Sequence, residues 1–263
     1  MMWNYFFSEF KKTPILLSKM EIKVLDKVFN LLEYAGEKSP APIIPTEAAL
    51  ALGMPKSTCV RLLKVLTEKG FLEQLSARKG YILGPAAILL TDNLYHHLAS
   101  NSHHLLQDFA NELKVSVQLL ILQGDCKINI CGFNGNPGLN LDVRKIRHYD
   151  LHTSLSGRVL LSRACENEQK RVISTWKDNR GIFTNQSDEE ILLRLKELST
   201  QEISFGEHNG KHVAVAPLKI NGKYIAAIGV VWLFNQENLR EKIVERLKKI
   251  TLTIEGFVNI EVI

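Results

Sequence analysis

The residues whose chemistry best suits binding lie within nine positions, and they are Lys56, Ser57, Thr58, Arg61 and Lys64. At about 100° per residue in an α-helix, Arg61 and Lys64 fall within about 40° of Ser57, so these three would share one face. Their ammonium, guanidinium and hydroxyl groups can donate hydrogen bonds to base edges and phosphates in a DNA groove. Lys56 and Thr58 would lie at the helix N-terminus, where backbone amides and the helix dipole favour a phosphate.

The opposite side of this segment is apolar and consists of Cys59, Leu62, Leu63 and Leu66. A surface helix with a solvated charged face has the same pattern, so the segment alone leaves that alternative open. Its local charge is distinctive, because residues 53–80 contain six Lys or Arg against two Asp or Glu, whereas the whole chain of 263 residues has 33 against 28. A concentrated basic patch suits an anionic partner.

The elements around this segment determine how it is presented. We predict helices over residues 20–35, 47–52 and 56–69, followed by two short strands, FLEQL (71–75) and YIL (81–83), around a polar turn. Gly36 and the prolines after it end the first helix, Thr46 caps the second, and Gly70 ends the third. Helix, helix, turn, helix and hairpin is the order of a winged helix-turn-helix module.

Beyond Gly84-Pro85 the pattern changes to strands and helices in alternation. We predict helices over 86–98, 102–113, 155–163 and 188–198 and a last one from about 239, with strands over 115–122, 127–133, 202–206, 212–220 and 224–234. Asn209-Gly210 and Asn221-Gly222 are hairpin-turn signals. These elements predict an α+β domain, a mostly antiparallel sheet flanked by helices.

The predicted boundaries divide the chain into an N-terminal extension at 1–19, a winged helix-turn-helix domain at 20–84, a linker helix at 85–101 and a sensor domain at 102–263. The extension is aromatic and lacks the basic start of a signal peptide. We expect it to pack on a partner subunit or, if translation begins at Met20, to be absent from the native protein.

Composition and spacing also narrow the class of protein. The four cysteines form no CxxC pair, which favours a reducing cytoplasmic compartment, and no apolar run reaches the ~18–20 residues that span a bilayer. We predict no metal site, because the histidine pairs 96–97 and 103–104 are expected on an exposed linker, while His148, His152, His208 and His212 fall in turns or strands.

The motifs MPKSTCVRLLKVLTEKGFLEQ and GYILGP, within residues 54–85, closely resemble the winged helix-turn-helix of IclR-type transcriptional regulators, whose pattern is roughly LPKSTxxRLLxxLxxxGYL…YRLGP. YDLHTSLSGRVLLS (149–162) resembles the family's PLHATALGKALLA segment, and GKHVAVAPLKINGKYIAAIGVV (210–231) resembles its strand pair. The matches occur in the family's order and cover about residue 21 to the C-terminus.

The resemblance implies a cytoplasmic regulator, commonly a repressor, that binds a pseudo-palindromic double-stranded DNA operator as a homodimer or a dimer of dimers. It also implies a C-terminal GAF-like domain that binds a small organic acid, and no cofactor. The DNA-contacting residues that we predict are Thr46, Lys56, Ser57, Thr58, Val60, Arg61, Lys64, Arg78 and Lys79.

The resemblance also places an effector site at the start of helix 155–163. Thr153 is the expected N-cap, amides and hydroxyls nearby would hold a carboxylate, and Gly157 would let a ligand or a neighbouring backbone approach closely. The family's cysteine and serine positions fall on Val213 and Val231, which predicts a more apolar pocket, a different ligand or none. The effector-binding residues that we predict are Thr153, Ser154, Leu155, Ser156, Gly157, Val213 and Val231, with polarity from Glu207, His208, Asn209 or His212 as an alternative.

Two other classes of function stay open. The chain could be a metabolite-binding module whose winged helix contacts protein, and such binding would lack the steep salt dependence of phosphate contacts. It could also be an enzyme that uses Cys131 or Cys165, although the sequence contains no GxSxG, HExxH, Walker or dinucleotide fingerprint. We therefore predict no catalytic residues.

Overall fold

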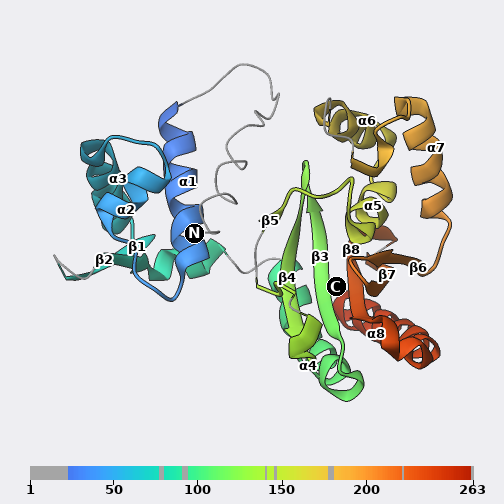
Figure 1. Ribbon diagram of the computed structural model, residues 1–263. Helices are drawn as coiled ribbons and strands as arrows, with labels where there is room; N and C mark the ends of the chain where they lie inside the picture. The colour runs from blue at the N-terminus through green and yellow to red at the C-terminus, as the bar shows by residue number, and fades with distance from the viewer. Residues whose placement is uncertain are drawn as a thin grey trace. The chain divides into compact units, whose positions relative to one another are not determined.

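The computed structural model describes residues 23–76, 80–90, 94–139, 141–144, 147–176, 181–220 and 222–261 (Figure 1). The chain forms two units that meet between Asn93 and Leu94. The predicted extension at 1–19 and the predicted wing-tip residues Arg78 and Lys79 lie outside the described residues.

The first unit is a winged helix-turn-helix. Its elements are α1 (Lys23–Lys38), α2 (Pro45–Ala51), α3 (Lys56–Glu68), β1 (Leu72–Ser76), β2 (Gly80–Leu83) and the 3₁₀ helix η2 (Pro85–Leu90). Its core contains the buried residues Leu31, Ile43, Ala48, Cys59, Leu63, Leu66, Leu72 and Tyr81. The predicted order of helices and strands is therefore confirmed.

Two predicted helix ends in this unit are wrong. α1 continues through Gly36 to Lys38, because one helical glycine costs only about 1 kcal/mol and the buried Ala35 and Leu31 hold the helix on the core. α2 begins at Pro45, which is preorganised for a first turn, and Thr46 therefore lies inside the helix instead of capping it.

The wing hairpin is joined to the segment before α2. β1 and β2 are antiparallel, with Leu72 opposite Leu83 and Gln74 opposite Tyr81. Tyr81 and Ile43 exchange two backbone hydrogen bonds, with N–O distances of 2.7 and 2.9 Å. This bridge fixes the hairpin against the start of α2.

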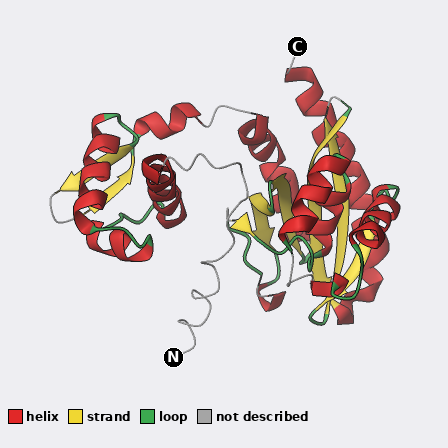
Figure 2. Cartoon of the chain, turned by 90° about the horizontal axis from the view of Figure 1, so that it is seen from above, coloured by secondary structure: helices red, strands yellow, loops and turns green. Residues whose placement is uncertain are grey.

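The second unit is a six-stranded antiparallel sheet with helices on both faces (Figures 1 and 2). In chain order its elements are α4 (Leu94–Leu113), β3 (Ser116–Gln123), β4 (Cys126–Asn134), η3 (Pro137–Leu139), β5 (Arg147–His148), α5 (Leu155–Ser162), α6 (Glu166–Thr175), η4 (Gly181–Phe183), α7 (Asp188–Ser199), β6 (Ser204–His208), β7 (Lys211–Ile220), β8 (Lys223–Leu233), η5 (Phe234–Leu239) and α8 (Arg240–Glu261). The strand order is β5-β4-β3-β8-β7-β6. The predicted α+β class is confirmed.

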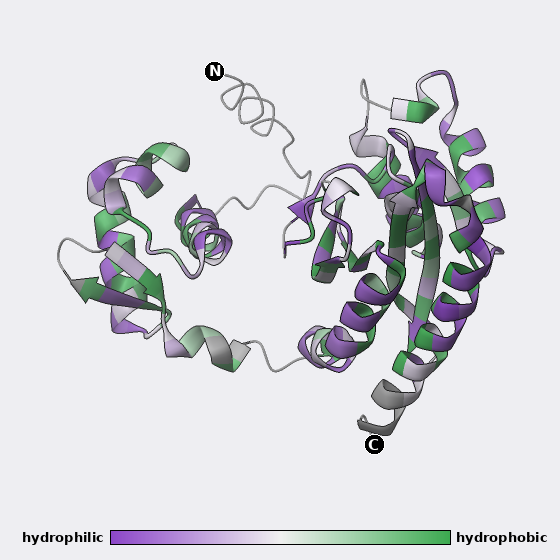
Figure 3. Ribbon diagram, turned by 60° about the horizontal axis from the view of Figure 1, so that its bottom comes forward, coloured by the Kyte–Doolittle hydropathy of each residue, from purple (hydrophilic) through white to green (hydrophobic). Residues whose placement is uncertain are grey.

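Alternation along the strands separates the two faces of this sheet. One face packs on α4 and α8 through residues such as Ala214, Val230 and Phe109. The other packs on α5 through residues such as Val215 and Val159. Figure 3 shows hydrophilic residues along the outer sides of the helices around this sheet.

Several predicted elements of the second unit differ from the structure. The predicted helices 86–98 and 102–113 are instead η2 and a continuous α4, because the buried Ser102 donates its hydroxyl hydrogen bond to the Leu98 carbonyl at 2.6 Å and needs no break. α6 was not predicted, because Val172 and Ile173 are the only apolar residues in its sequence ENEQKRVIST. Asn209 and Gly210 form the predicted turn, with φ of 48° and 72°.

No helix in the described ranges is long and apolar enough to cross a membrane. The described residues also contain no group of three or more His, Cys, Asp or Glu side chains that could hold a metal ion. α4 carries both histidine pairs on one helix, and His103 packs edge-on against Phe133 with ring centroids 4.8 Å apart.

Candidate functional site

α3 has the two faces that its sequence predicts. Cys59, Leu62, Leu63 and Leu66 are buried against the first unit's core. Burial raises the pKa of the Cys59 thiol. The predicted contact residues lie on the other side: Lys56, Ser57, Arg61 and Lys64 are exposed, and Thr58 and Val60 are partly exposed. The basic and hydroxyl side chains are therefore presented together.

The N-terminus of α3 is open to a ligand. Its N-cap is Pro55, and no side chain caps the first backbone amides. A helix leaves its first amides without intrahelical partners, so these groups can bind a phosphate oxygen. Thr46 is exposed in the first turn of α2, the helix that packs against α3.

The start of α5 is held by Ser154, not by Thr153. The Ser154 hydroxyl oxygen accepts a hydrogen bond from the Gly157 amide at 3.1 Å, which makes Ser154 the N-cap. Thr153 is exposed and its hydroxyl lies 3.3 Å from the Asp150 carbonyl. The predicted cap at Thr153 is therefore wrong by one residue, because a turn over Asp150–Thr153 precedes the helix.

A lysine that sequence reasoning missed lies against this helix start. Lys127 on β4 is 6% exposed, and its Nζ donates to Ser154 Oγ at 2.7 Å, Ser156 Oγ at 2.9 Å and Asp150 Oδ2 at 3.0 Å. Burial lowers the pKa of Lys127, and the Asp150 carboxylate opposes that effect. The signal in the sequence was a charged residue at the start of the strand KINICGF, whose other residues are uncharged.

Gly157 and Leu155 complete the first turn of α5. A Cβ on Gly157 would lie 2.5 Å from the Leu151 Cα, so the close approach at this position is to backbone. Leu155 packs in the same cluster as Val213, and its Cδ2 would meet a Cβ on Gly206 at 3.3 Å. The first turn of α5 thus joins the Lys127 contacts to the apolar face of β7.

Polar side chains on the α5 face of β3 and β4 hold the segment between β4 and β5. Gln118 Nε2 donates to the Asp142 carbonyl at 2.7 Å, and Asn129 Nδ2 donates to the Val143 and Arg144 carbonyls at 2.7 and 3.0 Å. Asn129 is fully buried, and its Oδ1 has no hydrogen-bond partner within the described ranges.

Of the alternative polar residues, Glu207 and His212 line one pocket together with the predicted effector residue Val213. His212 is adjacent to Val213 on β7, so their side chains point to opposite faces of the sheet. His212 packs on the rings of Trp232 and Phe234, with centroids 5.3 and 4.4 Å away, and its Nδ1 is 3.7 Å from a Glu207 carboxylate oxygen. His208, Asn209 and Glu207 are exposed at that hairpin.

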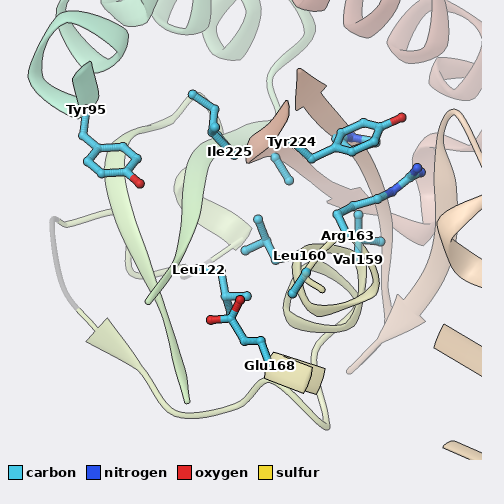
Figure 4. Close-up of a pocket in the computed structure, with 12 residues that line it drawn as sticks. Tyr95, Leu122, Val159, Leu160, Arg163, Glu168, Tyr224 and Ile225 are labelled. Carbon is cyan, nitrogen blue, oxygen red and sulfur yellow. The ribbon is translucent and has the colours of Figure 1, made fainter. Parts of the chain in front are cut away.

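A cavity of about 150 Å³ lies at the other end of α5 (Figure 4). Leu122, Leu160 and Ile225 give it apolar walls, and Tyr95 and Glu168 reach it from α4 and α6. Arg163 lies over the Tyr224 ring, 4.5 Å from its centroid, and donates to the Gln201 carbonyl at 2.6 Å. The predicted effector residues do not line this cavity.

The chain is similar in sequence to a domain family and to regulators that are already known. Residues 24–76 match the model of the IclR helix-turn-helix domain. The regulator Rv1719 of Mycobacterium tuberculosis is 29% identical over 104 residues, which are 40% of each chain. The regulator KdgR of Dickeya chrysanthemi is 25% identical over 90% of this chain and 83% of its own. Both relatives are described as HTH-type transcriptional regulators.

Solved structures share the fold over nearly the whole chain. An IclR homologue of Microbacterium hydrocarbonoxydans, complexed with 4-hydroxybenzoate, has a TM-score of 0.72 and 19% identity over 89% of this chain and 98% of its own. The IclR regulator of Alicyclobacillus acidocaldarius has a TM-score of 0.66 and 20% identity over 90% and 99% of the two chains. These likenesses extend the agreement in fold to the second unit.

Proposed function

We propose that this chain, whose residues 24–76 match the IclR helix-turn-helix domain, is a transcriptional regulator that represses transcription by inserting α3 into the major groove of a pseudo-palindromic operator. Two or four copies of the chain would bind together in the cytoplasm, since a palindrome presents the same half-site twice. Ser57, Arg61 and Lys64 would contact bases and phosphates. Thr46, Lys56, Thr58 and Val60, with Arg78 and Lys79 on the wing, would complete the interface.

The observation that carries this proposal is the pair of opposite faces on α3. Leu63 is fully buried while Arg61 and Lys64 are exposed on the same helix, and the helix start carries no side-chain cap. An ordinary solvated surface helix needs no such concentration of positive charge on one face.

The test is a mobility shift of the full chain on the DNA that flanks its own gene, against competitor DNA and at two salt concentrations. Specific retardation that weakens steeply with salt is expected, because phosphate contacts release counterions. Binding that resists salt, or that only a protein partner elicits, would favour a winged helix that contacts protein.

We also propose that a small organic acid binds at the first turn of α5 and shifts the population competent for DNA. Support comes from the serine hydroxyls that gather there and from the structurally similar protein that is complexed with an aromatic acid. Thr153, Leu155, Gly157, Val213 and Val231 would form the rest of the site. Calorimetry with small carboxylic acids, repeated in the presence of operator, tests this part.

A further inference from the structure

The ammonium group of Lys127 is enclosed by the protein. Its side chain is 8% exposed, and three oxygens, from Ser154, Ser156 and Asp150, lie within 3.0 Å of Nζ. Removing an ammonium from water costs several kcal/mol unless charge and hydrogen bonds compensate for it. Two of its three acceptors are neutral hydroxyls, so Asp150 is the carboxylate that neutralises Lys127.

Asp150 is an incomplete partner for this buried cation. Its side chain is 41% exposed, and its second carboxylate oxygen, Oδ1, is itself buried without a hydrogen-bond partner in the described part of the chain. The pair is therefore partly exposed on the Asp150 side alone, where water weakens the attraction between opposite charges.

The surroundings of Lys127 are positive beyond this one pair. The start of α5 places the positive end of the helix dipole against Nζ. The partly buried guanidinium of Arg158 donates to the Thr153 carbonyl at 3.0 Å and adds a second cation whose charge disfavours the charged form of Lys127. Two cations and a helix N-terminus face one half-exposed carboxylate, so the site favours a further or better-placed anion.

We propose that Lys127 is the receptor for the carboxylate of the effector, and that Asp150 holds this position until a ligand carboxylate displaces it. The ligand would be a small monocarboxylate, bound by Lys127 Nζ and the hydroxyls of Ser154 and Ser156. This inference rests on the proposed function for the location of the effector. Leu155 lies between the two serines and packs near Val213. Displacement of Asp150 would therefore shift the first turn of α5.

The experiment removes the competing charge and keeps its shape. Asp150→Asn is titrated with sodium formate, acetate and benzoate in thermal denaturation and calorimetry, always against equal sodium chloride. Because the resident carboxylate is gone, these acids should bind Asp150→Asn about tenfold or more tightly than they bind the wild type. Lys127→Met combined with Asp150→Asn should lose that gain. The matched control is Glu166→Gln, which unpairs Lys170 on α6 and should leave carboxylate binding unchanged.

If Asp150 only ties its loop to β4, Asp150→Asn will bind the acids no better than the wild type, and the inference is wrong. It is also wrong if the double variant gains as much as the single one. Ser156→Ala, which removes one acceptor and keeps the lysine, gives an independent reading should the double variant fail to fold.

Operator binding separates this inference from the proposed function: an acid that releases DNA equally from the wild type and Lys127→Met overturns the inference alone. Carboxylate binding that depends on Lys127 but never alters operator affinity overturns the proposed effector role alone.

Discussion

Val213 on β7 and Val231 on β8 are direct cross-strand neighbours on the α5 face of the sheet. Val231 is also paired with Ser116 on its other side. The two positions at which the chain departs from the IclR-type pattern that it resembles are thus in contact range of each other. With valine at both positions, they form an apolar cross-strand pair.

Val231→Thr tests that patch with little change of shape. A hydroxyl placed in a half-buried apolar environment should lower the free energy of unfolding by about 1 kcal/mol, and it should shift acid binding toward hydroxylated ligands. Urea denaturation and calorimetry measure the two effects. Val24→Thr on the exposed side of α1 is the control and should change stability by less than about 0.5 kcal/mol. An unchanged ligand preference would place the effector away from Val231.

Arg61→Ala should weaken operator binding by about 1–3 kcal/mol and relax the base preference at one position, provided that the guanidinium contacts a guanine. Fluorescence anisotropy on the operator and on single-base variants measures both. Lys69→Ala removes the same charge at the far end of α3 and is the matched control. Equal losses in the two variants would mean that α3 contributes only general positive charge.

Gly80→Ala should destabilise the first unit selectively. Gly80 has φ of 87°, and a Cβ there would lie 2.4 Å from the Ile43 carbonyl oxygen, so the wing and the segment before α2 would have to separate. We expect a loss above about 2 kcal/mol in the first unit's transition. Gly210→Ala is the comparison, since a Cβ there meets no atom within 4 Å.

Acid should destabilise the second unit through His148. Burial, together with the charge of Lys127, lowers the pKa of His148 below its ordinary 6.5, while Asp150 and Asp142 partly oppose this. The unfolded chain then binds the proton more tightly, so stability is complete above pH 6.5 and falls as the pH drops from 6.5 through the folded-state pKa. Urea midpoints between pH 5 and 8 should show the decline, and His148→Gln should flatten it.

Thiol labelling should show that one of the four cysteines, Cys165, reacts much faster than the others. Cys165 is exposed, whereas Cys59, Cys126 and Cys131 are buried, and burial raises the pKa of the Cys59 thiol, which suppresses the reactive thiolate. With an aromatic disulfide reagent, Cys165→Ser should abolish the fast phase. Rapid labelling of Cys59 in the native protein would contradict the closed core around α3.

The sequence could predict those parts of the structure that depend on residues close together in the chain. The faces of α3 follow from the 3.6-residue period, and the Asn209-Gly210 turn follows from two residues that tolerate positive φ. α6 was missed because its two apolar residues, Val172 and Ile173, are too few to define a helical period in the sequence.

No local sequence pattern predicts the cluster that Lys127 forms with Asp150, Ser154 and Ser156. Lys127 meets Ser154 and Ser156 across 27 and 29 residues, and only the fold brings them together. The resemblance to the family indicated the first turn of α5 but not the cation beneath it. Thr153 was predicted as the cap for a similar reason, since only the turn that starts at Asp150 decides which hydroxyl reaches the Gly157 amide.

The bridge between Ile43 and Tyr81 bears on how quickly the protein can sample DNA. Two backbone hydrogen bonds join the wing strand to the segment that leads into α2, so hairpin and helices keep one shape before any encounter. The described part of the wing and the start of α2 are therefore already joined before they meet a partner, which lowers the entropic cost of forming an interface through them. In the proposed DNA-binding role, this preorganised contact would suit repeated brief encounters along the duplex.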